Sequence, residues 1–412
     1  MQWLGIMSAL EKDLIPFTRD ARSHEGNLAV MLTGGGARAA YQVGLIKGIA
    51  CHFPNLHFQI ITGVSAGAIN AVFLASKPGS LEEKAYALER MWCELNCGTI
   101  YHFDWRIMVP FRSALASLLH RKKRSRPRGM VDTAPLRELL YRVFDSSPGQ
   151  AIRGIEENLR EGWLQAVALI TMDYTTGQSV RWVQGRNLDH SEGPNRRNAL
   201  ARLTAEHVLA SAALPFVFPA VKIDDRWHGD GGIRLSAPLS AAVQLGASRI
   251  IAMSTGYQRT PDEASTPVVK GYPPAAQIIG QLVNAIFLDA IDEDVVRMER
   301  MSEMISKLDV RERNGFRPID LLVMRPSVDL GRLAAEYEHE LPLNLRLLTR
   351  ALGASETESP DFISMLMFEP GYTKRLIEIG EADVETRRDE LRAFLGTPNR
   401  APLRSNLNKN LP

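Results

Sequence analysis

Short apolar runs that end in glycines alternate with apolar helical stretches near the start of the chain. Residues 27–33 (NLAVMLT) predict a buried strand, and the glycines at 34–36 predict a turn into a helix. Residues 57–62 predict a second short strand, and a sharp turn and an apolar helix follow it over residues 63–76. Two strand–turn–helix units in succession are typical of an α/β fold with a mainly parallel sheet.

The rest of the chain predicts more strands and then a helical end. Residues 164–183 predict a strand, a turn and a returning strand. Buried strands are expected near residues 221–224, 249–254 and 319–324. Apolar residues at helical spacing over 277–308 predict a long helix, so we expect the last third of the chain to be mostly helical.

Composition and charge exclude several classes of protein. The 412 residues are 45% hydrophobic and 23% charged, as in ordinary globular proteins, and the net charge of +2 gives no reason to expect nucleic acid as a partner. Three cysteines predict no disulfide framework. The first residues lack the pattern of a secretory signal, and no run of about 18 apolar residues predicts a membrane span. We therefore expect a cytoplasmic protein.

A pentapeptide between the second predicted strand and its helix fits the pattern G-x-S-x-G. It consists of Gly63, Val64, Ser65, Ala66 and Gly67. A serine on such a turn projects from a strained backbone, and small flanking residues relieve the crowding around it. The helix that begins there adds positive potential for a developing oxyanion. The motif predicts a nucleophilic Ser65, although small residues are also common at ordinary strand–helix turns.

The glycine-rich turn after the first strand has two possible functions. Gly34, Gly35 and Gly36 would let backbone N–H groups converge on an anion. A dinucleotide site also needs an acidic residue about 20 positions further on, and residues 27–81 contain no Asp or Glu. An oxyanion hole needs only N–H donors near the nucleophile, so this function is favoured. Arg38 either anchors the loop through a salt bridge or meets an anionic head group.

A nucleophilic serine needs a general base, and histidine is poorly placed to be that base here. Only His339, in an acidic helical stretch, follows Asp230, so a serine–acid–histidine order is awkward. Asp230 itself lies in the sequence GDGG with Gly231 and Gly232. We expect these glycines to form an exposed turn that carries Asp230 toward Ser65, although an isolated Asp-Gly pair is usually a plain turn. His228 is expected to make surface hydrogen bonds.

Three elements in this order, GGGAR, GVSAG and DGG, resemble the patatin-like phospholipase family. The resemblance covers about residues 27–254. It implies a three-layer α/β/α sandwich, a Ser65–Asp230 dyad without histidine, and an oxyanion loop of Gly34–Gly36 with Arg38. It implies no cofactor and no metal. Ala39 stands where many members have glycine or serine.

The resemblance implies a serine lipid acyl hydrolase of the phospholipase A or lysophospholipase type. An acyltransferase with the same dyad is the alternative, and a catalytically silent lipid-binding module is a third reading. We expect an N-terminal extension over residues 1–26, a catalytic domain over 27–255, a helical region over 256–396 packed on it, and a flexible tail over 397–412. The sequence leaves the oligomeric state open.

A basic run follows an apolar stretch and suggests contact with an anionic membrane. Arg121, Lys122, Lys123 and Arg124 begin this run, after the stretch VPFRSALASLLH. An apolar helical face beside a basic cluster is typical of a membrane-surface segment. A solvated loop after a packed helix explains the same residues. The expected partner is a phospholipid or lysophospholipid substrate, with peripheral contact to an anionic membrane as a further possibility.

Overall fold

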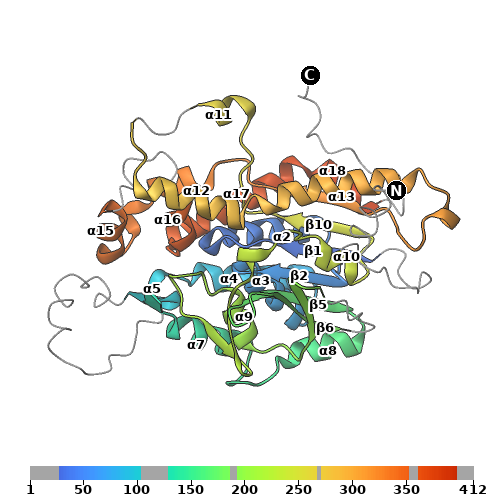
Figure 1. The fold of residues 1–412 in the computed structure, drawn as a ribbon, viewed down its shortest axis with the longest axis horizontal. Coiled ribbons are helices and arrows are strands. Elements are labelled where there is room, and N and C mark those ends of the chain that lie inside the picture. Colours follow the sequence, from blue (N-terminus) through green and yellow to red (C-terminus); the bar gives the residue numbers. More distant parts are fainter. Residues whose placement is uncertain (1–26, 104–128, 186–192, 267–270, 352–360, 397–412) are drawn as a thin grey trace, which may run out of the picture.

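The fold is seen in a computed structural model that describes residues 27–103, 129–185, 193–266, 271–351 and 361–396 (Figure 1). Its centre is a mixed, mostly parallel sheet with the strand order β11-β10-β1-β2-β5-β6-β7, to which β9 adds by pairing with β5 and β8. The strands are β1 Leu28–Leu32, β2 Ile60–Val64, β5 Ala166–Asp173, β6 Ser179–Gly185, β7 Arg196–Leu200, β8 Val221–Ile223, β9 Arg226–Asp230, β10 Arg249–Met253 and β11 Asp320–Met324.

The central strands are apolar throughout because both faces of the sheet are covered. Every residue of β1 (LAVML) and of β2 (IITGV) is buried, as expected for parallel strands between two layers of helices. The parallel pairs join β11, β10, β1, β2 and β5 in turn, whereas β6 and β9 run antiparallel to β5. A separate short pair, β3 His102–Phe103 and β4 Val131–Asp132, lies outside this sheet.

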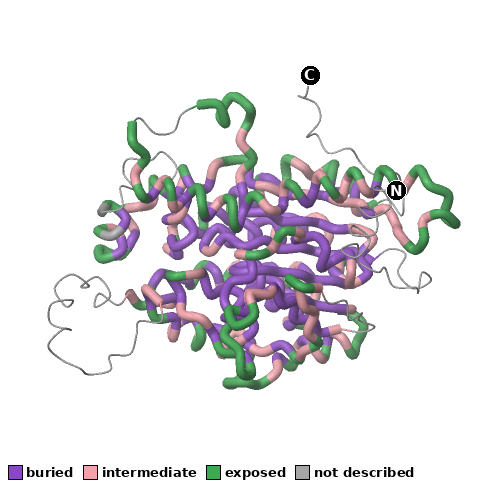
Figure 2. Tube along the Cα trace, viewed as in Figure 1, coloured by how far each residue is buried: buried purple, intermediate pink, exposed green. Residues whose placement is uncertain are grey.

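Helices cover both faces, which confirms the expected three-layer α/β/α sandwich. One face packs against α10 Ser240–Gln244 and α13 Ala290–Ser306. The other face packs against a larger core, and Figure 2 shows the buried chain running through the middle of the molecule. Its helices are α2 Ala40–His52, α3 Ala66–Ser76, α4 Leu81–Cys93, α5 Cys97–Ile100, α7 Ala134–Val143, α8 Arg153–Glu161 and α9 Ala205–Ser211.

The C-terminal part of the chain is built into the same core. Strand β11 extends the sheet beyond β10, and α17 Pro370–Thr386 lies along α2 (Figure 1). The two helices meet at glycines: a side chain at Gly44 would strike the backbone of Ile377, and one at Gly380 would strike the backbone of Tyr41. The other C-terminal helices are α11 Pro261–Ser265, α12 Ala275–Phe287, α14 Leu330–Glu336, α15 Leu343–Ala351, α16 Asp361–Leu366 and α18 Arg388–Gly396.

The helical stretch expected over 277–308 consists of two helices, α12 and α13, joined at Leu288 and Asp289. One local expectation was wrong. The sequence HGDGG is not an exposed turn: β9 continues to Asp230, and a short 3₁₀ helix, Gly231–Arg234, follows. Glycine is rare within strands, so the sequence alone pointed to a turn.

One stretch of the described residues, 275–306, is long and apolar enough to cross a membrane by length and composition. This evidence is weak, because a core helix of a soluble protein meets the same criterion. The expectation that the chain has no membrane span stays a prediction.

The α2–α17 contact gives a first prediction. Gly380→Ala should lower the free energy of unfolding by about 1–3 kcal/mol, because overpacking a tight backbone contact forces the helices apart. The midpoint of urea denaturation measures this loss. Gly396→Ala, at the end of α18 with no atoms near the added methyl group, is the control and should leave the midpoint nearly unchanged. Equal midpoints in the two variants would contradict the tight contact.

Candidate active site

Ser65 lies at the turn between β2 and α3, as the G-x-S-x-G pattern predicts. Its backbone has φ 56° and ψ −133°, a conformation that non-glycine residues rarely adopt. The residue is buried, and its N–H donates to the Ser211 hydroxyl at 3.0 Å. The strained turn therefore fixes the direction of the Ser65 side chain before any substrate binds.

The glycines on either side make this turn possible. A side chain at Gly63 would strike Ala68, Ala71 and the Gly67 carbonyl, all on the helix that follows. A side chain at Gly67 would strike the backbone of β1 at Leu32. The motif glycines are thus required by close approach of backbone to backbone, as the pattern implies.

Asp230 ends β9 next to Ser65, and its side chain is completely buried. Its Oδ1 accepts a hydrogen bond from the Gly232 N–H at 2.8 Å. Its Oδ2 has no hydrogen-bond partner of standard length among the described residues. Burial raises the pKa of Asp230 to about 7. Hydrogen bonding to the Ser65 hydroxyl and the Gly232 N–H acts in the opposite direction but is the weaker effect. A carboxyl group with such a pKa is suited to accept a proton near neutral pH.

The loop of three glycines lies directly against the nucleophile. A Cβ atom at Gly34 would lie 2.9 Å from the Ser65 Cβ, so only glycine permits this approach. The N–H groups of Gly35 and Gly36 have no acceptor among the described residues. The Thr255 hydroxyl donates to the Gly34 carbonyl at 2.5 Å and fixes the loop from β10. The loop therefore offers free donors near Ser65, the requirement for an oxyanion hole.

Arg38 anchors this loop from within the protein, which decides between its two expected roles. The side chain is buried, with Nη2 2.5 Å from the Asp361 carboxylate and Nε 2.6 Å from the Ser364 hydroxyl. The second Asp361 oxygen accepts from Asn284 of α12 at 2.7 Å. A guanidinium enclosed in this way is not placed to meet a head group. Helix α16 thus holds the glycine loop from the C-terminal part of the chain.

The sequence assigned no role to several of these positioning residues. Ser211 joins the elbow to β5, because its hydroxyl accepts from Ser65 and donates to the Ile170 carbonyl at 2.7 Å. Asp361 and Asn284 come from a polar segment and an apolar helix without a motif. Only the spatial arrangement assigns them a role.

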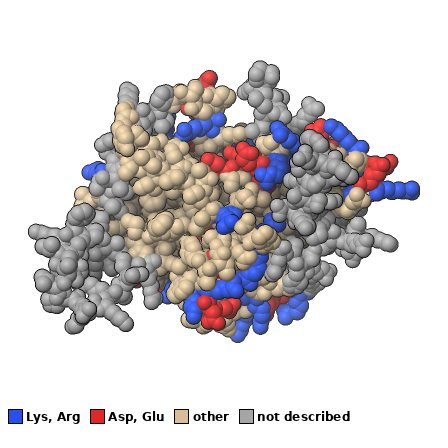
Figure 3. Space-filling view, in the orientation of Figure 1, with Lys and Arg blue, Asp and Glu red and all other residues tan. Residues whose placement is uncertain are grey.

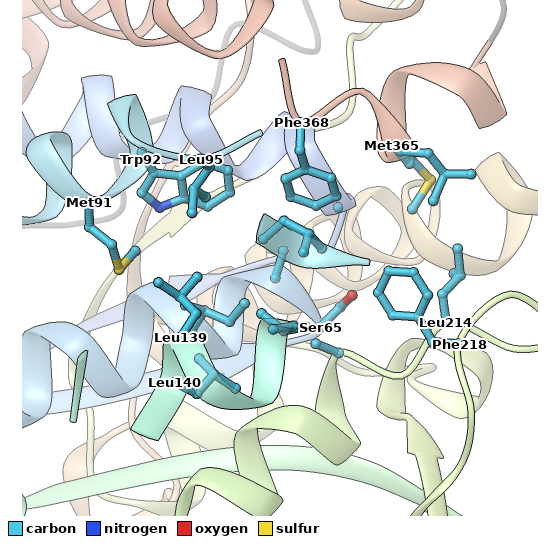
Figure 4. A pocket seen from close by; sticks show the side chains of 17 residues that line it. Ser65, Met91, Trp92, Leu95, Leu139, Leu140, Leu214, Phe218, Met365 and Phe368 are labelled. Atoms are coloured by element: carbon cyan, nitrogen blue, oxygen red, sulfur yellow. The ribbon is translucent and has the colours of Figure 1, made fainter. Parts of the chain in front are cut away.

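An apolar pocket opens beside Ser65 (Figure 4). Leu214, Phe218 and Met365 surround the Ser65 hydroxyl, and the pocket continues toward Trp92 and Leu140. Apart from Ser65 and the Trp92 indole N–H, which donates to Asn70, the described side chains that line it are apolar, so the pocket fits a hydrocarbon chain. The full lining is Gly36, Ser65, Ala66, Ile69, Met91, Trp92, Leu95, Ile100, Leu136, Leu139, Leu140, Ala212, Leu214, Phe218, Met365, Leu366 and Phe368.

The basic run and His228 are not part of this site. The basic run that begins at Arg121 lies outside the described residues. His228 is buried, contrary to the expectation of surface hydrogen bonds: its Nδ1 lies 3.0 Å from the Thr171 hydroxyl and its ring packs on Trp182. Within the described parts of the chain, no group of three or more His, Cys, Asp or Glu side chains is arranged to hold a metal ion.

The fold and the candidate site have the features of an α/β serine hydrolase. The model of the patatin-like phospholipase family matches residues 30–243, more than half of the chain. The chain therefore belongs to the patatin-like phospholipase family. No curated protein matches it in sequence.

Similar solved structures include two of one human enzyme and one of a protein from Legionella pneumophila. Human GIVD cytosolic phospholipase A2 is 13% identical with a TM-score of 0.45, covering 95% of this chain and 63% of that one. The same human enzyme in complex with methyl gamma-linolenyl fluorophosphonate is 14% identical, with a TM-score of 0.41 and coverages of 95% and 62%. VipD from Legionella pneumophila is 12% identical, with a TM-score of 0.27 and coverages of 90% and 72%. The chain thus spans less than two thirds of the human enzyme.

The raised pKa of Asp230 predicts the pH dependence of activity. The carboxylate form accepts the proton, so kcat/KM on a soluble ester should rise with pH around an apparent pKa of about 7 and then level off. A pH–rate profile of the free enzyme measures this. A profile that is already flat between pH 5 and 8 would contradict an unusually basic Asp230.

Asp230→Asn is the matched variant for this prediction. Because the folded-state pKa lies above the ordinary value of 3.8, the wild type loses stability as the pH rises from about 4 to 7. The neutral variant should escape this loss, so it should be inactive at every pH but melt at a higher temperature than the wild type above pH 7. Equal melting temperatures of wild type and Asp230→Asn at pH 8 would mean that the ionised Asp230 does not lower the stability of the fold, which would contradict the prediction.

The anchoring of Arg38 gives a separate prediction. Asp361→Asn should lower kcat at least about tenfold with a smaller change in KM, because a displaced glycine loop loses donors that act in the transition state. Asp383→Asn is the control: this carboxylate is also buried and accepts from Tyr41, but it lies on α17. Steady-state kinetics at a temperature where both variants are folded should separate them. Equal losses of kcat in the Asp361→Asn and Asp383→Asn variants would mean that Asp361 only stabilises the fold and does not position the glycine loop.

Proposed function

We propose that the protein cleaves a fatty acyl ester of a phospholipid or lysophospholipid, with Ser65 as nucleophile and Asp230 as general base. One juxtaposition supports this most: Ser65 on its strained turn, beside a fully buried carboxyl group of raised pKa, at the mouth of an apolar pocket. A polar reactive group beside an apolar pocket suits a substrate with a long hydrocarbon chain and an ester.

Each step then has a group in place. Asp230 takes the proton of Ser65 as its oxygen attacks the ester carbonyl, and the carbonyl oxygen becomes an oxyanion facing the Gly35 and Gly36 N–H groups. The C–O bond to the alcohol breaks, and the proton held by Asp230 goes to the leaving alcohol. Asp230 next takes a proton from water, whose oxygen attacks the acyl-enzyme carbonyl. The bond to the Ser65 oxygen then breaks, the proton held by Asp230 returns to that oxygen, and the fatty acid is released.

The acyl chain is proposed to lie in the apolar pocket. Burial of methylene groups contributes about 0.8 kcal/mol each, so the pocket supplies binding energy for a chain and none for a short polar acyl group. Met365 and Phe368 come from the C-terminal part of the chain and form one wall. The sequence analysis divides the chain into a catalytic domain over 27–255 and a helical region over 256–396. We propose that both parts contribute side chains to one site. We propose a cytoplasmic protein in peripheral contact with membranes.

Ser65→Ala tests the proposal. The variant should release no measurable fatty acid from mixed phospholipid and lysophospholipid vesicles, measured by mass spectrometry, while its circular dichroism spectrum stays unchanged. Ser80→Ala, at the exposed start of α4, is the control and should remain active. A fluorophosphonate probe should label the wild type and not Ser65→Ala. Fatty acid release by folded Ser65→Ala would overturn the assignment of the nucleophile.

A further inference from the structure

Helix α12 exposes an apolar stripe that nothing in the described structure covers. Its 13 residues include no charged side chain. Ile278, Leu282 and Ile286 follow one another at four-residue spacing and are 44%, 58% and 37% exposed. The opposite side, with Val283 and Phe287, is buried in the core. Figure 3 shows a broad face with few charged side chains in the region of α12.

The length of α12 favours a helix that lies on an apolar phase instead of crossing it. Thirteen residues span about 20 Å, whereas the hydrocarbon core of a bilayer is about 30 Å thick. A longer span would have to continue into α13, which carries Asp292, Glu293 and Asp294 in its first two turns. A helix that is apolar on both sides, with one side packed, is stable in the plane of an interface.

Beside the end of this stripe lies a wide hollow rich in arginine. Ala285, Ile286 and Ala290 form one wall, and Arg181, Arg196 and Arg234 lie among the other lining residues, which include no Asp or Glu. The remaining lining residues are Ile170, Ser179, Gly193, Pro194, Asn195, Gly232, Ile233, Leu235, Ser236, Ala237 and Ser240.

These arginines lack carboxylate partners among the described residues. Arg181 is buried and donates to the Ser240 hydroxyl at 3.0 Å and to Gln244. Arg234 donates to the Asn195 amide oxygen and the Gly177 carbonyl. In the part of the chain that the structure describes, the Nε atoms of Arg181 and Arg196 have no hydrogen-bond partner. Burial, and then the charge of Arg196, lower the pKa of Arg181 to about 9, so an anion in the hollow would relieve both effects.

We propose that α12 and the arginine hollow together form the surface with which the protein docks on a phospholipid bilayer. The apolar stripe enters the acyl-chain region, and lipid phosphates occupy the hollow, where planar guanidinium groups suit phosphate oxygens. The choice of a phospholipid rests on the proposed function. The docking surface consists of Ile278, Leu282, Ile286, Arg181, Arg196 and Arg234 and is distinct from the basic run that begins at Arg121.

The docking surface adjoins the candidate active site. Gly232 lines the hollow, and Phe287 packs so closely on Gly232 that a side chain there would strike its ring. Asn284, on the inner side of α12, donates to Asp361, which anchors Arg38. A bilayer held on α12 thus lies next to both the Asp230 turn and the glycine loop.

Charge favours a bilayer over a second copy of the chain. A two-fold interface places the same patch on both partners. Two copies meeting here would bring arginine against arginine, with no carboxylate in the lining to compensate. A phospholipid surface supplies both components that the docking surface lacks, hydrocarbon and phosphate.

Vesicle flotation tests the stripe. Wild type should float with phosphatidylcholine–phosphatidylserine vesicles. The double variant Leu282→Glu with Ile278→Glu should weaken binding by about tenfold or more, because two charged side chains would have to enter the acyl-chain region. Met304→Glu is the control: Met304 is 68% exposed on α13, away from the stripe, and the variant should bind like the wild type. Equal binding by all three proteins, or equal loss in the control, would overturn the proposal, as would a wild type that does not float.

The arginine hollow is tested with a lipid that lacks phosphate. Arg196→Gln with Arg234→Gln should weaken binding to phospholipid vesicles and leave binding to triolein droplets unchanged, whereas Arg375→Gln, exposed on α17, should change neither. Equal loss on both lipids would overturn the phosphate assignment. A change in sedimentation coefficient with unchanged flotation, in either set of variants, would assign the surface to contact between copies and overturn the proposal.

Failure of the docking surface and failure of the proposed function are distinguishable. The docking variants should keep wild-type activity on a soluble short-chain ester, because none of the changed residues contacts Ser65 or Asp230. Ser65→Ala should float like the wild type and release no fatty acid. Loss of soluble-ester activity in the docking variants would contradict a role confined to docking.

Discussion

The carboxyl group of Asp230 is removed from water with a single standard hydrogen bond, and the rest of the candidate site is arranged around that fact. Burial without a cation favours the neutral form and brings the pKa to about 7. The site is therefore most stable protonated, yet the proposed chemistry needs the carboxylate. A buried group of this kind persists only if the surrounding fold holds it firmly, and β9 does so by pairing with both β5 and β8.

The glycine loop needs other residues to order it, because three consecutive glycines have little conformational preference of their own. Its order comes from distant parts of the chain: the Thr255 hydroxyl on one side, and the Arg38–Asp361 pair on the other. A buried ion pair adds little to net stability, because desolvation offsets the attraction. Its effect here is to select one loop conformation, which explains why helices beyond the family match are needed to complete the site.

The sequence predicted the parts of this protein that depend on local backbone geometry. The apolar strand and the glycine turn near Ser65 are encoded within a few residues, and the order of the motifs singles out Asp230 as the candidate base. The sequence did not predict that Asp230 is buried at the end of a strand, because the pairing of β9 with β5 is set about 60 residues away along the chain. Asp361 and Ser211 act through contacts that no local pattern encodes.

Neighbouring residues of strand β6 point to opposite faces of the sheet, and the two faces differ in chemistry. Side chains alternate along β6, so Trp182 points toward His207 and the helices around the apolar pocket, while Arg181 points toward Ser240 and the arginine hollow. The sheet thus separates a hydrocarbon-shaped pocket from a phosphate-suited hollow, and Ser65 and Asp230 lie at the strand ends between them. The same alternation that builds the core therefore gives the two sides of the sheet different chemistry, apolar toward the pocket and cationic toward the hollow.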